Sequence, residues 1–473
     1  MRRKRRQTYP DLFKVVDLAQ SSIPPELAAD ALLRVASAQR NHDRAWKIEL
    51  LDSAFALSAL AREPNRQKAI GSKLVATNRT EILSLGFDQR LDRLSLQTRT
   101  VREMLKLDQA HALDTFQHIG WPELRRCKCR DALIDHVDDY YRLLGEIAES
   151  VFTAEERRRG RHIEMLSYQL VRMRSPVEVG PAAKMLSSAT LAENELTLLG
   201  SQLAASLDRI ESDDRSFAAS FGAAGEDADR LVRALVARNV STGGIVAAYR
   251  RYLIRHLAGS RCTDSGGDEF ASSVRDSFNK NFASDTDPNR APLKADDIKP
   301  AKTEGQADWE PFVSDDEFEK AWESYLDLML GKGHGPLLSK GTKPLAEEQK
   351  NSAEWHTQFD EFLHQIDELK PTTAEPEYRY FYRKATVLQG ALRVAPAGPE
   401  RDKVVRLFVS FLRSSNLQQE SVLEWYAQLQ RTASAVRGIG ATANAKFLDD
   451  LESSGHGILS LFALATKVVP EHE

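Results

Sequence analysis

Apolar residues recur along most of this chain at spacings of three, four and seven residues, which places them on one face of an α-helix. The alternation of apolar and polar residues that is typical of a half-buried β-strand is hardly seen. The clearest stripes are Leu91, Leu94, Val101 and Leu105; Leu196, Leu199, Leu203, Leu207 and Ile210; and Phe318, Trp322, Tyr325, Leu326 and Met329. The spacing therefore predicts an all-α fold built from amphipathic helices.

Three sites have the spacing of a capping box, in which a Ser or Thr and an acidic residue three positions later satisfy each other's free backbone N–H groups. They are Thr153 with Glu156, Thr190 with Glu193, and Ser314 with Glu317. At the last site, Val313 and Phe318 add the apolar contact of a hydrophobic staple. We predict that helices begin at these three positions.

Consecutive helices of the first half are expected to form antiparallel pairs joined by short turns. The pairs are residues 24–39 with 44–61, 88–107 with 109–119, and 131–152 with 154–173. Each pair spans on the order of 35 to 40 residues, which is the size of a helical repeat unit. No segment holds the tetratricopeptide or ankyrin consensus, however. We therefore predict an α-solenoid-like architecture, resembling tetratricopeptide or HEAT arrays without their consensus motif, and an irregular helical bundle remains the alternative.

The distribution of charge divides the chain into blocks. A chain of 473 residues exceeds the size at which one hydrophobic core keeps growing. Residues 264–323 carry 16 acidic and seven basic side chains, although the net charge of the whole chain is only −4. We predict a basic N-terminal tail with a short helix at residues 1–20, a helical-hairpin array at 21–283, an acidic linker rich in Pro, Asp and Lys at 284–311, and a C-terminal helical domain at 312–473.

The cysteines and the N-terminal residues indicate a cytoplasmic protein. The cysteines are Cys127, Cys129 and Cys262, and an odd count this low in so long a chain does not form a disulfide framework. The basic residues 1–6 lead into a charged segment and not into the apolar core of a secretion signal, so we expect a secreted or periplasmic location only if the true start lies upstream. No stretch approaches the roughly 20 apolar residues of a membrane-spanning helix, and no membrane insertion is expected.

Two groups of residues are candidate metal ligands. His356, Asp360 and His364 follow one another at spacings of four on one predicted helix, but eight residues rise about 12 Å, so one ion could take only an adjacent pair. Asp135 and Asp139 lie early on the predicted 131–152 helix, where carboxylates also serve as ordinary first-turn acids. Cys127 and Cys129 are one residue closer than the cysteines of a zinc knuckle. We assign no catalytic or cofactor-binding residue and expect no cofactor.

Residues 266–270 read Gly-Gly-Asp-Glu-Phe, which resembles in five letters the signature of the bacterial diguanylate cyclases. In that family the motif lies on a β-hairpin between apolar strands. Here the following residues, 271–278, have the pattern of an amphipathic helix after a glycine turn. We therefore predict a helix start at this position and not a cyclase.

Residues 378–384 interleave aromatic and basic side chains, a combination that can stack on nucleobases while neutralising phosphates. If this segment is helical, Phe381 and Leu388 face the interior, which is the commoner role of aromatic stripes. Arg2 to Arg6 form a second basic segment, but short basic termini are usually solvated. Nucleic acid is therefore not the partner that we expect.

By elimination, the leading hypothesis is a non-enzymatic scaffold or adaptor whose helical surface binds another protein. One alternative is an enzyme with a metal or acid-base site inside a helical bundle, for which Asp131 to Asp139, His356 and His364 would be the first suspects. A second alternative is a nucleic-acid-binding protein that uses residues 378–384. The sequence identifies neither the protein partner nor the oligomeric state.

Overall fold

The computed structural model describes residues 2–21, 23–68, 86–127, 133–259, 267–284, 286–298, 324, 352–371, 377–396, 398–415, 422–438 and 440–468. Within these residues the fold is all-α, as the apolar spacing predicts, and the strands are β1(Arg66–Lys68) and β2(Leu133–Asp135). No helix among the described residues is long and apolar enough to cross a membrane.

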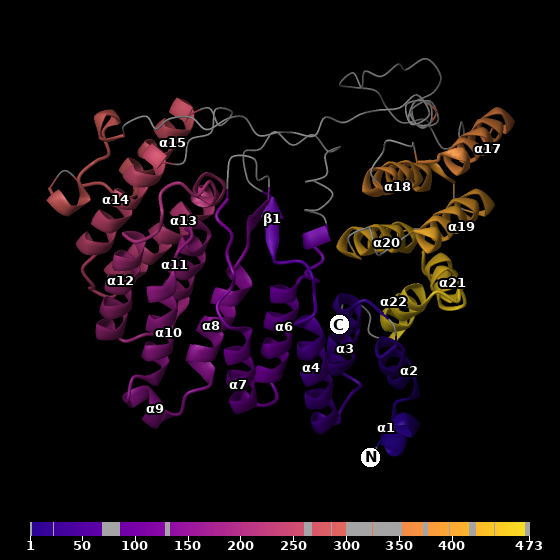
Figure 1. The fold of residues 1–473 in the computed structure, drawn as a ribbon, viewed down its shortest axis with the longest axis horizontal. Coiled ribbons are helices and arrows are strands. Elements are labelled where there is room, and N and C mark those ends of the chain that lie inside the picture. Colours follow the sequence, from indigo (N-terminus) through magenta and orange to yellow (C-terminus); the bar gives the residue numbers. More distant parts are fainter. Residues whose placement is uncertain are drawn as a thin grey trace. The chain divides into compact units, whose positions relative to one another are not determined.

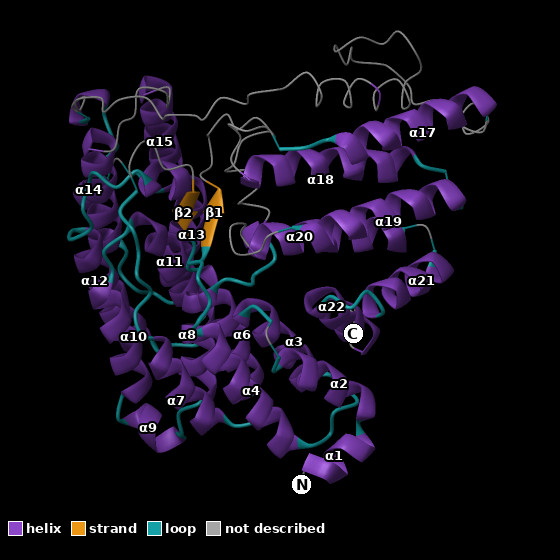
Figure 2. Ribbon diagram, turned by 45° about the vertical axis from the view of Figure 1, so that its right-hand side comes forward, coloured by secondary structure: helices purple, strands orange, loops and turns teal. Residues whose placement is uncertain are grey.

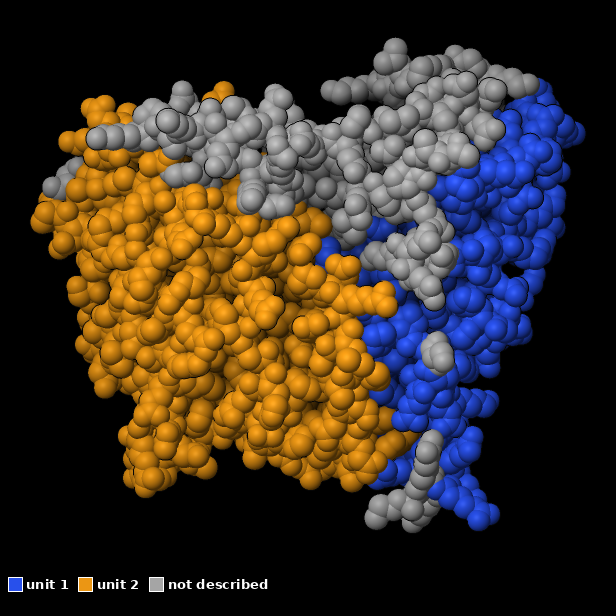
Figure 3. Space-filling view, in the orientation of Figure 1, with its two compact units in different colours: residues 1–42, 76–89, 310–473 blue, residues 43–75, 90–309 orange. Residues whose placement is uncertain are grey.

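The chain divides into two compact units, which Figure 3 shows in different colours. Unit 1 comprises Met1–His42, Ala76–Gln89 and Glu310–Glu473, and unit 2 comprises Asp43–Val75 and Arg90–Trp309. This division differs from the predicted blocks 21–283 and 312–473, because the first helices of the chain pack against its last one. The predicted pair 24–39 with 44–61 is also divided, since its helices α3(Pro25–Ser37) and α4(Arg44–Ser58) fall in different units.

Unit 1 is built from the two ends of the chain (Figure 1). Its helices are α1(Arg2–Thr8), α2(Pro10–Ala19), α3, α17(Ala353–Glu368), α18(Glu377–Val394), α19(Pro399–Ser414), α20(Val422–Arg437), α21(Ala441–Glu452) and α22(Gly457–Val468). Both α2 and α3 pack against α22. The basic residues at the start of the chain lie in α1, which packs against α2. The turn between α21 and α22 contains Gly455 at φ 71°, a conformation that favours glycine.

Unit 2 is a succession of packed helices (Figure 1). It contains α4, α6(Arg93–Leu105), α7(Gln109–Ile119), α8(Asp138–Ser150), α9(Ala154–Arg158), α10(Arg161–Arg172), α11(Val179–Ser188), α12(Glu193–Leu207), α13(Ser216–Ala237), α14(Gly243–Gly259) and α15(Gly267–Asn281), with short 3-10 turns at Pro176–Glu178, Pro288–Arg290 and Ala295–Asp297. The predicted pairs α6 with α7 and α8 with α10 pack together. Further along, α10 packs against α12 and α12 against α14, while α8 packs against α11 and α11 against α13.

The predicted helix starts have three different outcomes. At α9 the capping box is confirmed, because the amide of Glu156 donates to Oγ1 of Thr153 and the amide of Thr153 donates to Oε2 of Glu156, at 3.3 and 2.9 Å. The prediction for Thr190 with Glu193 is wrong: Ala192 precedes α12, and its amide donates to Glu195 at 2.8 Å. Ser314 and Glu317, with the Phe318 stripe, lie outside the described residues.

The helix predicted over residues 131–152 begins only at Asp138, which is a correction. Residues Leu133–Asp135 form β2, which pairs antiparallel with β1 (Figure 2). In the register of this pair, Arg66 lies opposite Asp135. The amide of His136 then donates to the carbonyl oxygen of Asn65 at 3.1 Å. Leu133 and Ile134 are buried, so this short apolar segment satisfies its backbone through the other strand and not through a helix.

The predicted 284–311 linker is also partly wrong, because its first residues pack against α14 and α15. Leu293 is only 2% exposed, and its amide donates to Asn279 Oδ1 at 2.7 Å. The guanidinium of Arg250 donates to the carbonyl oxygens of Ala291 and Pro292, at 3.0 and 3.2 Å. Helix α15 begins at Gly267, within the glycine motif, and includes residues 271–278, which confirms the predicted helix.

Candidate functional site

The three candidate ligands on α17 do not converge on one point. Nδ1 of His356 lies 3.5 Å from Glu400 Oε1, Asp360 accepts a hydrogen bond from Lys403 Nζ at 2.8 Å, and Nε2 of His364 lies 3.3 Å from Glu368 Oε1. These are ordinary surface ion pairs and helix contacts. Among the described residues, no group of three or more His, Cys, Asp or Glu side chains is placed to hold a metal ion.

The aromatic and basic segment at residues 378–384 lies in α18 and stabilises the end of α17. Lys384 is buried, and its Nζ donates to the carbonyl oxygens of Asp367 and Leu369 at 3.3 and 3.2 Å. Burial lowers the pKa of Lys384 below its ordinary value. Arg383 is buried as well, and Phe381 stacks on Phe411 with 5.2 Å between the ring centroids. These described side chains therefore do not form an exposed nucleic-acid surface.

A cleft of about 530 Å³ in unit 2 is lined by several arginine side chains. We call it the arginine cleft. Its charged and polar residues are Arg62, Arg66, Arg93, Arg125, Glu123, Asp135, His136, Asn65 and Gln97, and its apolar residues include Ile119, Trp121 and Leu124. Four guanidinium groups thus share one cleft with two carboxylates, which makes the cleft positive.

The start of α6 fixes one wall of the arginine cleft. Asp92 caps this helix by accepting a hydrogen bond from the amide of Ser95 at 2.9 Å. The next residue, Arg93, donates to the carbonyl oxygen of Ala61 through Nε and Nη2, at 3.3 and 3.1 Å. The amide of Arg93 also donates to the carbonyl oxygen of Glu63 at 3.2 Å. These bonds hold the segment before β1 against α6 and orient the guanidinium of Arg93.

The two-stranded sheet brings Arg66 and Asp135 to the cleft. Nε of Arg66 lies 3.8 Å from Oδ1 of Asp135, which is close enough for charge attraction but too long for a hydrogen bond. Oδ2 of Asp135 accepts a hydrogen bond from the amide of Arg125 at 2.6 Å. Burial raises the pKa of Asp135, although the amide of Arg125 and the charge of Arg66 oppose the rise. Asp135 therefore already has two protein partners.

Two donors beside the cleft have no acceptor among the described residues. Nδ2 of Asn65 is buried without a hydrogen-bond partner, and the whole residue is 7% exposed. Nε of Arg66 is also buried and makes no hydrogen bond. A buried donor without an acceptor is costly, so these two atoms reduce the stability of the segment that carries them.

An aromatic side chain closes the cleft on another side. Trp121 is half-buried and meets the ring of Tyr140 edge to face, with 6.2 Å between the centroids. The guanidinium of Arg172 lies 5.4 Å from the centroid of Trp121 and 5.0 Å from that of Tyr168. Because Arg172 covers one face of Trp121, less of the ring is open to stacking with a further group.

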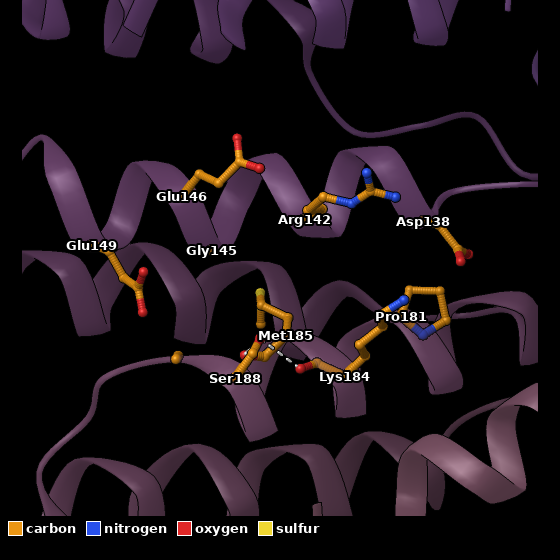
Figure 4. Close-up of a pocket in the computed structure, with 10 residues that line it drawn as sticks. Asp138, Arg142, Gly145, Glu146, Glu149, Pro181, Lys184, Met185 and Ser188 are labelled. Atoms are coloured by element: carbon orange, nitrogen blue, oxygen red, sulfur yellow. Dashed lines mark hydrogen bonds between the residues drawn. The ribbon is translucent and has the colours of Figure 1, made fainter. Parts of the chain in front are cut away.

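A smaller cleft of about 200 Å³ lies between α8 and α11. Figure 4 shows Asp138, Arg142, Glu146 and Glu149 along α8, with Lys184 on α11 across from them. Most of these charges already have partners. Glu146 accepts a hydrogen bond from Arg102 at 2.8 Å, and Arg142 lies 3.2 Å from Asp139. Glu149 accepts a hydrogen bond from the amide of Thr190 at 2.8 Å. This mixture of paired charges indicates a solvated groove and not a binding site.

The remaining predicted candidate, Asp139, is buried in unit 2. It is 2% exposed and lies 3.6 Å from Arg90 as well as near Arg142. Its neighbour Asp138 lies 3.4 Å from His136, so the two clefts adjoin at this contact. Burial opposes the ionisation of Asp138, but the hydrogen bond from His136 and the charge of Lys184 lower its pKa. Cys127 is buried, whereas Cys129 and Cys262 lie outside the described residues.

Sequence reasoning therefore missed the arginine cleft. Its arginines come from positions 62, 66, 93 and 125, and only Arg62 and Arg66 lie close together in the sequence. The local signal is the occurrence of Arg62, Arg66 and Lys68 within seven residues. Comparison of the chain with models of protein families, with curated proteins and with solved structures finds no match to any of them.

Proposed function

We propose that this protein is a non-enzymatic helical scaffold or adaptor that binds another protein, and that the arginine cleft holds an acidic segment of that partner. The observation that carries the proposal is the convergence of four arginines from three segments on one cleft, which only two carboxylates line among the described residues. Guanidinium groups bind carboxylates through two parallel hydrogen bonds, which gives both charge attraction and orientation.

The rest of the lining favours a peptide over a nucleic acid. Ile119, Trp121 and Leu124 offer apolar contacts to the side chains beside the acidic residues. Nucleobases are usually held by open aromatic faces, whereas Arg172 already covers one face of Trp121. A cleft of about 530 Å³ also suits a short peptide segment better than a whole folded surface.

Titration of the full-length protein with a fluorescent peptide rich in Asp and Glu, followed by anisotropy, tests the proposal. The double variant Arg62→Glu/Arg125→Glu changes two exposed arginines of the cleft and is expected to weaken binding by about tenfold or more. The control Arg158→Glu/Arg159→Glu makes the same charge change on the exposed last residue of α9 and the exposed residue that follows it, and its affinity is expected to stay within about twofold.

Two results would contradict the proposal. One is the absence of binding to the wild-type protein. The other is an equal loss of affinity in both double variants, which would show that net charge and not the cleft attracts the peptide. Far-ultraviolet circular dichroism of each variant checks that the helical fold is retained.

A further inference from the structure

We infer that the aromatic contact between α13 and α14 is a pH-sensitive switch, in which neutral His256 keeps the two helices together and protonation of its ring releases α14. The rings that form this contact, which we call the aromatic cluster, belong to Phe217 and Phe221 of α13, Tyr249, Tyr252 and His256 of α14, and Phe270 of α15. Figure 1 shows these three helices in the same part of unit 2. The switch does not depend on the ligand of the arginine cleft.

The ring of His256 is closed off from solvent inside the aromatic cluster. The residue is 0% exposed, and both ring nitrogens are buried without a hydrogen-bond partner among the described residues. The ring stacks on Phe217 with 4.9 Å between the centroids and packs against Tyr252 at 4.2 Å. A neutral imidazole has one N–H group, whereas the protonated ring has two and carries a positive charge. Because the cluster offers the ring neither acceptors nor water, it excludes the cation more strongly than the neutral ring.

The charged groups of α14 and at the end of α12 do not favour protonation of His256. Arg255 precedes His256 in the chain, and its positive charge opposes a second one on the ring. Burial, together with this charge, lowers the pKa of His256 from the ordinary value of 6.5 to about 3. Asp208, which follows α12, already accepts a hydrogen bond from Arg251 of α14 at 2.6 Å.

The charged groups on the other neighbouring elements do not compensate a protonated ring either. Arg215, which precedes α13, is basic, and Asp214 before it accepts hydrogen bonds from two backbone amides at 3.1 and 2.9 Å. Glu269 near the start of α15 is exposed. Burial raises the pKa of Glu178, in the 3-10 turn that packs against α13, to about 7. Protonation of Glu178 therefore favours the packed state at low pH, which is the opposite of the effect of His256.

The direction of the pH effect follows from the protons that each state binds. The packed state keeps His256 neutral down to about pH 3, whereas released α14 returns the ring to water, where its pKa is about 6.5. Between these two values the released state binds a proton that the packed state does not bind. The equilibrium constant for release therefore rises by about tenfold for each unit that the pH falls within this window. Above about pH 6.5 His256 contributes no further pH dependence.

Hydrogen–deuterium exchange of the full-length protein at pH 7 and pH 5 measures the release of α14. The exchange is read by mass spectrometry and corrected for the intrinsic pH dependence of amide exchange. The opening equilibrium constant of the α14 amides is expected to be about 20-fold larger at pH 5 than at pH 7. The opening constant of the amides in α6, which is remote from the aromatic cluster in unit 2, is expected to change by less than about threefold.

Variants assign the pH dependence to His256. His256→Phe keeps a planar ring in the stack and cannot be protonated, so the increase in the α14 opening constant is expected to fall to about twofold or less. His256→Leu is a second variant that does not titrate, and it keeps the test available where phenylalanine does not pack. His118→Phe is the matched control, because it removes an exposed histidine of α7 and is expected to keep the increase of about 20-fold. Far-ultraviolet circular dichroism checks that each variant retains the helical fold.

Three results would overturn the switch. One is an equal increase in the α14 opening constant in the wild-type protein and both His256 variants, because another group would then carry the pH dependence. Another is exchange of α14 in the wild-type protein that does not change between pH 7 and pH 5. The third is an equal increase in α14 and α6, which would show that unit 2 opens as a whole.

Discussion

Nε of Arg66 lies 3.8 Å from Oδ1 of Asp135, across the antiparallel pair of β1 and β2. The contact joins two segments that are far apart in the sequence and places a carboxylate beside the arginines of the cleft. Asp135 also accepts the amide of Arg125, so one side chain both organises the cleft and reduces its positive charge.

Asp135→Asn is therefore expected to strengthen binding without a loss of stability. The amide oxygen can still accept the hydrogen bond from Arg125, and the lost charge leaves the cleft more positive. We expect acidic peptides to bind about three- to tenfold more tightly, and the free energy of unfolding not to fall, because the burial that raises the pKa of Asp135 disfavours its charged form. Anisotropy and urea denaturation measure the two effects, and weaker peptide binding by the variant would contradict the role given to Asp135.

Glu178 makes the stability of unit 2 depend on pH. Burial raises its pKa to about 7, although the amides of Arg174 and Ser175 and the hydroxyl of Tyr141 donate hydrogen bonds to it. Because the pKa of Glu178 in the folded protein lies above the ordinary value of 4.5, the folded chain keeps a proton on Glu178 between pH 4.5 and about 7, whereas the unfolded chain has lost it. The contribution of Glu178 to the free energy of unfolding therefore decreases as the pH rises from about 4.5 to about 7, and is constant beyond this window.

The variant Glu178→Gln isolates this effect, because its amide can meet the same neighbours and does not titrate. Across the same pH window, the wild-type free energy of unfolding is expected to fall relative to that of the variant, by at most about 3 kcal/mol. Urea denaturation at several pH values measures the difference. Parallel pH profiles for the two proteins would show that Glu178 is not protonated in the folded state.

Thr153 and Thr190 have similar sequence surroundings but different roles. Thr153→Ala removes the side chain that accepts the amide of Glu156, so we expect a loss of about 1 kcal/mol in the local stability of α9. Thr190→Ala removes no described cap and is expected to change stability by less than about 0.5 kcal/mol. Hydrogen exchange of the amides in α9 and α12 measures both, and a similar loss in the two variants would contradict the observed helix start at Glu193.

Lys384 has a structural role that can be tested directly. Lys384→Met retains much of the apolar stem but leaves the carbonyl oxygen of Asp367 without this donor, so we expect a loss of about 1–3 kcal/mol in the free energy of unfolding. Lys403→Met is the matched control, because Lys403 is an exposed partner of Asp360 and is expected to contribute less than about 1 kcal/mol. Equal losses of unfolding free energy in the two variants would show that the burial of Lys384 does not determine its contribution to stability.

The helices of this protein could be predicted from the sequence because their signals are local. The stripe from Leu196 to Ile210 is buried at every predicted position, and the capping box at Thr153 is formed as its spacing indicates. The apolar stripe that begins at Leu91 is only partly formed. Leu91 is buried but precedes α6, and the polar residues Ser95 and Thr98 are buried in α6 together with Val101. These polar residues are satisfied locally, because the amide of Ser95 donates to the capping residue Asp92 and the hydroxyl of Thr98 donates to the carbonyl oxygen of Ser95.

The units and the candidate site could not be predicted because they depend on contacts between distant residues. No periodicity indicates that α2 and α3 pack against α22. A strand of three residues such as β2 is too short to show an alternating pattern, and its partner β1 lies about 65 residues earlier in the chain. Arg62 and Arg125 meet in one cleft only because that strand pair and the start of α6 hold their segments together.

The most direct test of the arginine cleft reverses the charges of the cleft and of the peptide. Wild-type protein and Arg62→Glu/Arg125→Glu are each titrated with an acidic peptide and with a peptide in which lysines replace the acidic residues. If the cleft holds an acidic segment, the wild-type protein binds the acidic peptide, and the double variant loses that binding and gains affinity for the lysine peptide. Equal binding of the acidic peptide by the two proteins would contradict the proposed site.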